Sequence, residues 1–185
     1  MFQSFLELGF EHILDPNGLD HVLFIIVLTV PYLLKDWKKV ILLATAFTLG
    51  HSLTLALASL NIVRIDSSLI EILIAVSIFI TALNNLIQKP GMNMTRAYVM
   101  ASFFGLIHGL GFSNFFRSIM SKDEILLPLF AFNLGVELAQ IVIVLMLLFV
   151  NYLLIEKLKL KHRIWIWGLS LLVMAWSCQM IFERI

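Results

Sequence analysis

Histidine and acidic side chains occur in this sequence within stretches that are otherwise apolar. His51 lies in the run FTLGHSLTL, His108 lies in FGLIHGLG, and Glu137 lies in NLGVELAQ. An ionisable side chain at the centre of a bilayer costs about 2.5 kcal/mol or more unless it has a partner. Imidazole and carboxylate groups bind divalent metal ions and relay protons. We therefore expect these side chains to face one another and to bind a metal ion inside a membrane.

The composition predicts a membrane protein. Hydrophobic residues make up 61% of the 185 residues, charged residues make up 14%, and the mean hydropathy is +0.98. A soluble domain carries about 25% charged residues. The net charge of +1 does not indicate a nucleic-acid partner, and no basic block is long enough to follow a phosphate backbone. The single cysteine, Cys178, excludes an internal disulfide and a metal site built from several cysteines.

Apolar segments of spanning length predict an all-α integral membrane bundle, with residues 1–185 in a single membrane domain. A helix needs about 20 residues to cross the hydrocarbon core, and a closed barrel is the alternative that also satisfies the backbone there. Residues 2–14 have the pattern of a short amphipathic helix that lies at the interface or dips into it. Six spans follow, at about 19–35, 39–60, 67–88, 97–118, 125–151 and 164–182.

The basic residues predict how these spans are oriented. The connections at 35–39, 89–96 and 157–163 hold nine of the lysines and arginines, and the other side of the membrane holds four. Lysine and arginine are enriched on the cytoplasmic side of membrane proteins. We therefore expect both termini to lie outside.

Helical spacing places the polar side chains of a span on one face. Side chains at i, i+4 and i+7 share a face of a helix. The second span has such a face with Thr48, His51 and Ser52, and the fifth has one with Asn133, Glu137 and Gln140. In the fourth span, Gly105 and Gly109 have the spacing that lets another backbone approach closely. We expect the polar faces to meet inside the bundle.

Each polar residue also has a purely structural interpretation. A membrane histidine can be only a hydrogen-bond partner between helices, and an amide such as Asn133 can do the same. Glu71 lies close enough to the interface to be solvated, and His12 and Asp15 can be surface residues of a turn. Glu137 is harder to explain in this way, because a deep carboxylate must be paired or neutral.

The joint occurrence of these residues in the outer half of the bundle favours a metal site. Imidazole with carboxylate suits nickel, cobalt, zinc or iron, whereas copper(I) prefers thiolate or thioether, so the residues do not name the ion. The predicted metal ligands are His12, Asp20, His21, His51, His108 and Glu137. The predicted residues beside the site or along a pathway are Glu71, Ser52, Thr48, Asn133, Gln140 and Asp15.

Five blocks in the same order resemble the HupE/UreJ family over about residues 9–140. They are His12…Asp20-His21, FxxxHSxT at 47–54, IExxIAxS at 70–77, GLIHGLGF at 105–112 and FNLGVELxQ at 132–140. Proteins of that family are bacterial inner-membrane proteins associated with hydrogenase and urease, and are regarded as nickel or cobalt permeases. The resemblance implies divalent-metal uptake, with His12, Asp20, His21 and the His108 block in the functional positions. The chain departs from the pattern in having seven residues between His12 and Asp20, and in having no acid shortly after His108-Gly109.

Three functions fit the residues. The first is a permease or facilitator that captures a divalent cation near the first span and passes it inward. The sequence has no Walker motif, so we do not expect this chain to hydrolyse ATP. The second is an intramembrane zinc hydrolase, in which Ser52 and Asp20 support a zinc-bound water. The third is an accessory protein that binds the ion without flux. Six spans are few for a transporter, which leaves a homo-oligomer as a candidate assembly.

Overall fold

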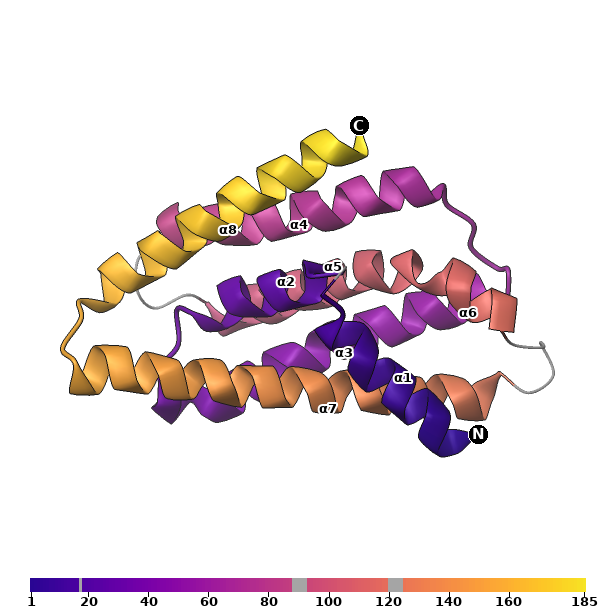
Figure 1. Cartoon of the computed structure of the whole chain (residues 1–185), viewed down its shortest axis with the longest axis horizontal. Coiled ribbons are helices and arrows are strands. Elements are labelled where there is room, and N and C mark those ends of the chain that lie inside the picture. The colour runs from indigo at the N-terminus through magenta and orange to yellow at the C-terminus, as the bar shows by residue number, and fades with distance from the viewer. Residues whose placement is uncertain (17, 88–92, 120–124) are drawn as a thin grey trace.

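The computed structural model describes residues 1–16, 18–87, 93–119 and 125–185, with the backbone alone at Arg117. The regular structure of these residues is helical, and Figure 1 shows long helices side by side along one axis. The helices are α1 (Phe2–Leu14), α2 (Asp20–Thr29), the 3-10 turn η1 (Leu34–Asp36), α3 (Trp37–Ser59), α4 (Ser67–Ile87), α5 (Met94–Gly111), α6 (Ser113–Ile119), α7 (Leu126–Asn151), the π-helical turn η3 (Tyr152–Lys157) and α8 (His162–Arg184).

The outer surfaces of the helices suit a lipid environment. By length and composition, four helical stretches in the described part of the chain can cross a membrane: Leu34–Ser59, Ser67–Ile87, Leu126–Lys157 and His162–Arg184. Along α7, Phe130, Leu134, Leu138, Val142 and Phe149 are all exposed. A soluble protein rarely exposes a continuous apolar stripe of this size. The described residues therefore confirm an all-helical protein with candidate membrane spans, whereas the predicted number of six spans is not confirmed.

The helix expected over 19–35 is shorter in the structure, where α2 covers only Asp20–Thr29. Proline has no backbone N–H, so Pro31 cannot donate to the carbonyl of Val27 four residues earlier. The side chain of Asn85 in α4 donates to that carbonyl instead, at 2.7 Å. The early end of α2 is thus compatible with a buried position, because a neighbouring helix satisfies the freed backbone group.

The helix expected over 97–118 is divided into α5 and α6 at Phe112. Gly109 and Gly111 lower the helix propensity of this segment. The hydroxyl of Ser113 donates to the carbonyl of Leu110 at 2.7 Å, which offers the backbone a partner outside the helix. The helices α3, α4, α7 and α8 begin and end close to their predicted bounds.

Glycines bring two pairs of helices into backbone contact. The helices α3 and α5 pack together extensively, as do α1 and α7. A Cβ on Gly105 would meet the carbonyl of Phe47 in α3, and one on Gly109 would meet that of His51. A Cβ on Gly9 of α1 would likewise meet the carbonyl of Phe132 in α7. The close approach predicted from Gly105 and Gly109 is confirmed.

The helices α1 and α2 follow one another in the chain and are separated by a short interruption. This break lies near the middle of the long axis of the bundle (Figure 1). A turn joins them, in which the amide of Gly18 donates to the carbonyl of Asp15 at 3.0 Å. Ile13, at the end of α1, is fully buried. Of the two positions considered for residues 2–14, the structure shows a helix that enters the bundle. The break places His12 and His21 in the interior.

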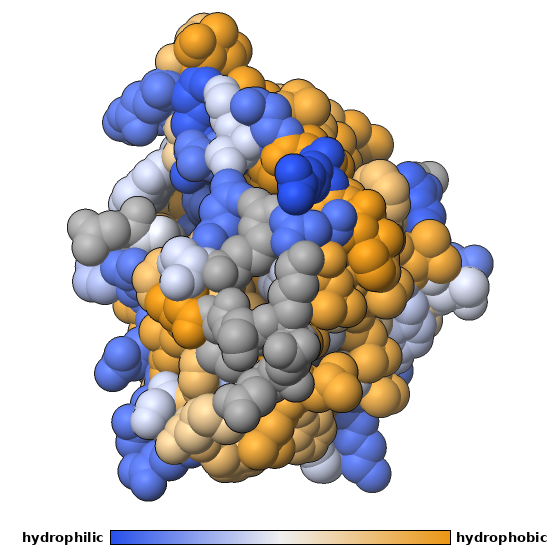
Figure 2. All heavy atoms as spheres, turned by 90° about the vertical axis from the view of Figure 1, so that its right-hand side faces the viewer, coloured by the Kyte–Doolittle hydropathy of each residue, from blue (hydrophilic) through white to orange (hydrophobic). Residues whose placement is uncertain are grey.

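The two ends of the bundle differ in their basic residues. The basic connections at 35–39 and 157–163 lie at the left end of Figure 1, whereas both termini lie in its right half. Residues 89–92 of the third basic connection lie outside the described residues. Figure 2 shows the right-hand end, where hydrophilic side chains occur among apolar ones. The arrangement of the ends agrees with the predicted topology, and the orientation in a membrane stays a prediction.

We expect Gly105→Ala to destabilise the bundle, because the new methyl group would meet the backbone of α3. Forced overpacking of this kind costs about 1–3 kcal/mol. Thermal unfolding of the detergent-solubilised protein, followed by tryptophan fluorescence, measures the effect. The matched control is Gly168→Ala in α8, where the added methyl meets nothing within 4 Å. Equal unfolding temperatures for Gly105→Ala and the wild type would contradict the close packing.

Candidate metal centre

Three histidines from three helices converge beside the break between α1 and α2. His12 comes from the last turn of α1, His21 from the first turn of α2, and His51 from the middle of α3. One ring nitrogen of each lies within 4.8 Å of the others. The ring centroids are 4.8 Å apart for His12 and His21, 5.7 Å for His21 and His51, and 6.3 Å for His12 and His51. We call these three residues the imidazole cluster.

Each ring of the imidazole cluster keeps one buried nitrogen without a hydrogen-bond partner in the described part of the chain. In all three residues this atom is Nε2. His51 is fully buried, and His21 is 6% exposed. Buried polar atoms in native proteins are nearly always paired, so three unpaired ones at one place call for an explanation. A metal ion would provide one, since a neutral imidazole nitrogen is the commonest metal ligand.

Aromatic side chains keep the imidazole cluster apolar on several sides. The rings of Phe47 and Phe132 lie nearly parallel to that of His51, with centroids 6.3 and 6.4 Å away and interplanar angles of 25° and 20°. The ring of Phe112 lies 4.2 Å from that of His12. Such apolar walls lower the polarity around an ion bound beside them, which strengthens its interactions.

Asn133 of α7 fixes the tautomer of His51. The amide nitrogen of Asn133 donates to the carbonyl of Leu129 at 2.8 Å, so its Oδ1 is the atom that faces His51. This oxygen lies 3.4 Å from Nδ1 of His51 and can only accept a hydrogen bond. His51 therefore carries its proton on Nδ1, which leaves the lone pair on Nε2 free. Outer-shell partners of this kind orient metal-binding histidines.

His108 lies next to the imidazole cluster and presents its other nitrogen. Its ring centroid is 5.1 Å from that of His21. The hydroxyl of Ser77 donates to the carbonyl of Ile74 at 2.7 Å, so it accepts from Nε2 of His108 at 3.0 Å. Nδ1 of His108 is then the unprotonated atom, and it is buried without a partner among the described residues. His108, a predicted ligand, thus lies beside the cluster but outside the three histidines whose ring nitrogens lie within 4.8 Å of one another.

The structure places Glu137 and Gln140 away from the imidazole cluster, in a polar interface between α3 and α7. Thr45 donates to the carboxylate of Glu137 at 2.5 Å, and Thr48 contacts Oε1 of Gln140 at 3.0 Å. Ser52 donates to the backbone carbonyl of Thr48 at 2.7 Å. The polar faces of α3 and α7 do meet, as their spacing predicted. Glu137, however, lies beside Thr45 and outside the group of histidines close enough to share an ion.

The structure pairs Asp20 with a residue from the other end of the chain. Arg184 of α8 lies with Nη2 at 3.2 and 3.3 Å from the two carboxylate oxygens of Asp20. Its Nη1 donates to the backbone carbonyl of Glu71 at 2.9 Å, and the side chain of Glu71 is exposed. The sequence assigned no role at the site to Arg184, and Ser77 entered only as the last residue of the family block at 70–77, because neither has a spacing that links it to a histidine.

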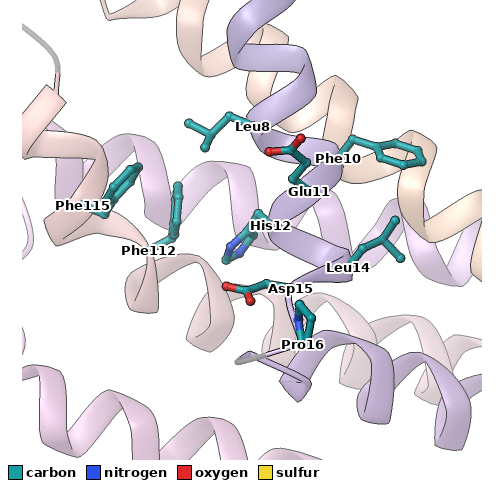
Figure 3. A pocket seen from close by; sticks show the side chains of 9 residues that line it. All are labelled: Leu8, Phe10, Glu11, His12, Leu14, Asp15, Pro16, Phe112 and Phe115. Atoms are coloured by element: carbon teal, nitrogen blue, oxygen red, sulfur yellow. The ribbon is translucent and has the colours of Figure 1, made fainter.

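An open cleft of about 740 Å³ reaches His12 from the surface. Figure 3 shows the ring of His12 and the carboxylate of Asp15 directed toward each other, with Phe112 and Phe115 opposite. Glu11 and Asp15 add two acidic groups to a wall that is otherwise mostly apolar. Acidic groups at the mouth of a low-dielectric cleft raise the local concentration of cations. The cleft is therefore a suitable entrance for a metal ion.

Comparison with known families agrees with the resemblance in the sequence. A family model described as HupE / UreJ protein matches residues 1–184. The chain belongs to the HupE/UreJ family. No curated protein and no solved structure matches the chain.

We expect Asn133→Leu to weaken metal binding roughly 10–100-fold, the usual effect of losing an outer-shell partner. The substitution removes the acceptor that holds the proton on Nδ1 of His51. Titration of the purified protein with Co²⁺, followed by its visible absorption, measures the affinity. Asn133→Asp keeps an acceptor and should retain binding. The control is Gln140→Leu, which removes an amide of the same helix that contacts Thr48; equal losses in both would contradict the assignment.

Proposed function

We propose that this HupE/UreJ protein is a membrane permease for a divalent transition-metal ion of the nickel or cobalt type. The observation that carries the proposal is the convergence, at a helix break inside the bundle, of three buried imidazole nitrogens that have no hydrogen-bond partner among the described residues. Broken helices at membrane depth are a recurring feature of substrate sites in transporters. A nitrogen-rich set without thiolates suits nickel, cobalt, zinc or iron(II).

The proposed route begins at the cleft and ends in the inner half of the bundle. A hydrated cation enters past Glu11 and Asp15 and exchanges water for the imidazole nitrogens of His12, His21 and His51. His108 is the next nitrogen along the route, and the polar interface around Glu137 continues it. We place the protein in the bacterial inner membrane, with six crossings and both termini in the periplasm. The cleft then opens to the periplasm, which is the direction of uptake.

The competing function is an intramembrane zinc hydrolase, in which a zinc ion stays bound at the site. Three imidazoles with a fourth position for water are also the ligand set of many catalytic zinc sites. The hydroxyl of Ser52 donates to a backbone carbonyl of its own helix, so it is committed to α3. A zinc hydrolase would hold one tight, slowly exchanging zinc and cleave an ester or amide, and an accessory protein would bind the ion without flux. Flux therefore separates the permease from both.

Substitution of His51 tests the site. We expect His51→Ala to abolish both Co²⁺ binding in detergent and Ni²⁺ or Co²⁺ uptake into proteoliposomes, because it removes the fully buried member of the cluster. The control is His162→Ala, which removes a histidine whose ring contacts the carbonyl of Val30. Uptake by His51→Ala at the wild-type rate would refute the proposal.

Substitution of Glu137 separates binding from movement. Glu137→Gln keeps the size of the side chain and a hydrogen bond to Thr45 but removes the charge. We expect Co²⁺ affinity to be unchanged and the uptake rate to fall about tenfold or more, equivalent to roughly 1.4 kcal/mol in the barrier. Stopped-flow fluorescence of a metal indicator inside the vesicles measures the rate. Loss of Co²⁺ binding in this variant would mean that Glu137 binds the ion together with the imidazole cluster.

A further inference from the structure

We propose that Arg184 acts as a built-in competitor of the transported ion, because it holds the carboxylate of Asp20 that the ion needs. This inference rests on the proposed function and deepens it. In the structure Asp20 binds the guanidinium of Arg184. When a divalent cation reaches the imidazole cluster, Asp20 turns to the cation and Arg184 is released. Arg184 thereby determines how tightly this chain holds its substrate.

The contact between Arg184 and Asp20 is well defined. One guanidinium nitrogen lies 3.2 and 3.3 Å from the two carboxylate oxygens, and another donates to the carbonyl of Glu71 at 2.9 Å. The side chains of Arg184 and Asp20 are 22% and 16% exposed. A partly buried carboxylate needs a positive partner, and removing that partner is costly. Arg184 therefore compensates the charge of Asp20, and it also ties the end of α8 to α2 and α4.

The charge of the imidazole cluster explains why the ion would compete for Asp20. Three neutral imidazoles provide nitrogen atoms but no negative charge. A divalent cation inside an apolar bundle requires charge compensation. Asp20 precedes His21 in the first turn of α2, so its carboxylate is attached to the same turn as a member of the cluster. Once Arg184 releases it, this carboxylate is a negative group attached to the chain directly beside a member of the cluster.

The position of Arg184 makes its release simple. It is the last residue of α8, and Ile185 next to it is 87% exposed. An arginine stays charged at any accessible pH, so it competes with the metal ion under all conditions of growth. A permease must bind its ion firmly enough to admit it and weakly enough to release it. A competing internal cation lowers the affinity without removing a ligand.

The test is a double-mutant cycle measured by Co²⁺ titration of the full-length protein in detergent. We expect R184Q to bind Co²⁺ about tenfold more tightly than the wild type, within the usual range of coupling between two sites. D20N should bind more weakly, and adding R184Q to D20N should change the affinity much less than it does alone. The control is R163Q in the first turn of the same helix, where the guanidinium lies over the ring of Trp167.

Each outcome decides the proposal. Equal tightening by R184Q in the wild-type and D20N backgrounds would overturn it, because it would indicate general repulsion instead of competition for one carboxylate. Unchanged or weaker binding by R184Q, or the same shift in R163Q, would also overturn it. If R184Q does not fold, R184K replaces it: the single ammonium holds Asp20 less firmly, so tighter binding supports the proposal and unchanged or weaker binding overturns it.

The proposed function fails separately from this inference. If the wild type binds no Co²⁺, or if His51→Ala binds it as the wild type does, both are wrong. If the histidine variants lose binding as expected while R184Q does not bind more tightly, the inference alone is wrong.

Discussion

The break between α1 and α2 is the constraint on which the rest of the structure depends. Backbone groups in the membrane interior must find partners, so an interrupted helix is tolerated only where protein surrounds it. Here α7 covers α1 through the contacts at Gly9 and Gly135, and Asn85 satisfies the carbonyl that Pro31 leaves free. With these partners in place, the break brings histidines from two short helices to the depth at which α3 carries a third.

The dense packing of α3 against α5 serves the same arrangement. Gly105 and Gly109 let the backbones touch beside Phe47 and His51. The two rings of His51 and His108 thus come from helices that cannot slide apart without opening a gap. A metal-binding constellation needs rigid supports of this kind, because small displacements of a ligand weaken the site.

Much of the fold followed from the sequence, because apolar length and helical period are local properties. The bounds of α3, α4, α7 and α8 are close to those expected from them. The end of α2 at Thr29 was harder to predict from the sequence. It depends on Asn85, which is distant in the sequence and whose side chain donates to the carbonyl of Val27 in place of the N–H that Pro31 lacks. The turn after His12 was visible as a turn, but its depth in the bundle depends on Gly135 of α7, which no local pattern reveals.

The candidate site shows the same division. The spacing of His51 and Asn133 placed them on faces that meet, and they do meet. Glu137 shares its face with Asn133, yet it lies one turn further along α7, and a turn is about 5.4 Å. At that distance its carboxylate contacts Thr45 and not the histidines.

This offset gives the interior two chemically different regions. Nitrogen atoms gather near the break, and oxygen atoms gather between α3 and α7. A borderline metal ion prefers the first region, whereas the single carboxylate of the second offers charge with harder ligands. An ion that moved from the nitrogen atoms near the break to the oxygen atoms between α3 and α7 would leave the ligands it prefers. It would gain the negative charge of a carboxylate that compensates its own. Neither region would then hold the ion so firmly that it could not pass on, which is the condition that transport imposes and that storage or catalysis does not.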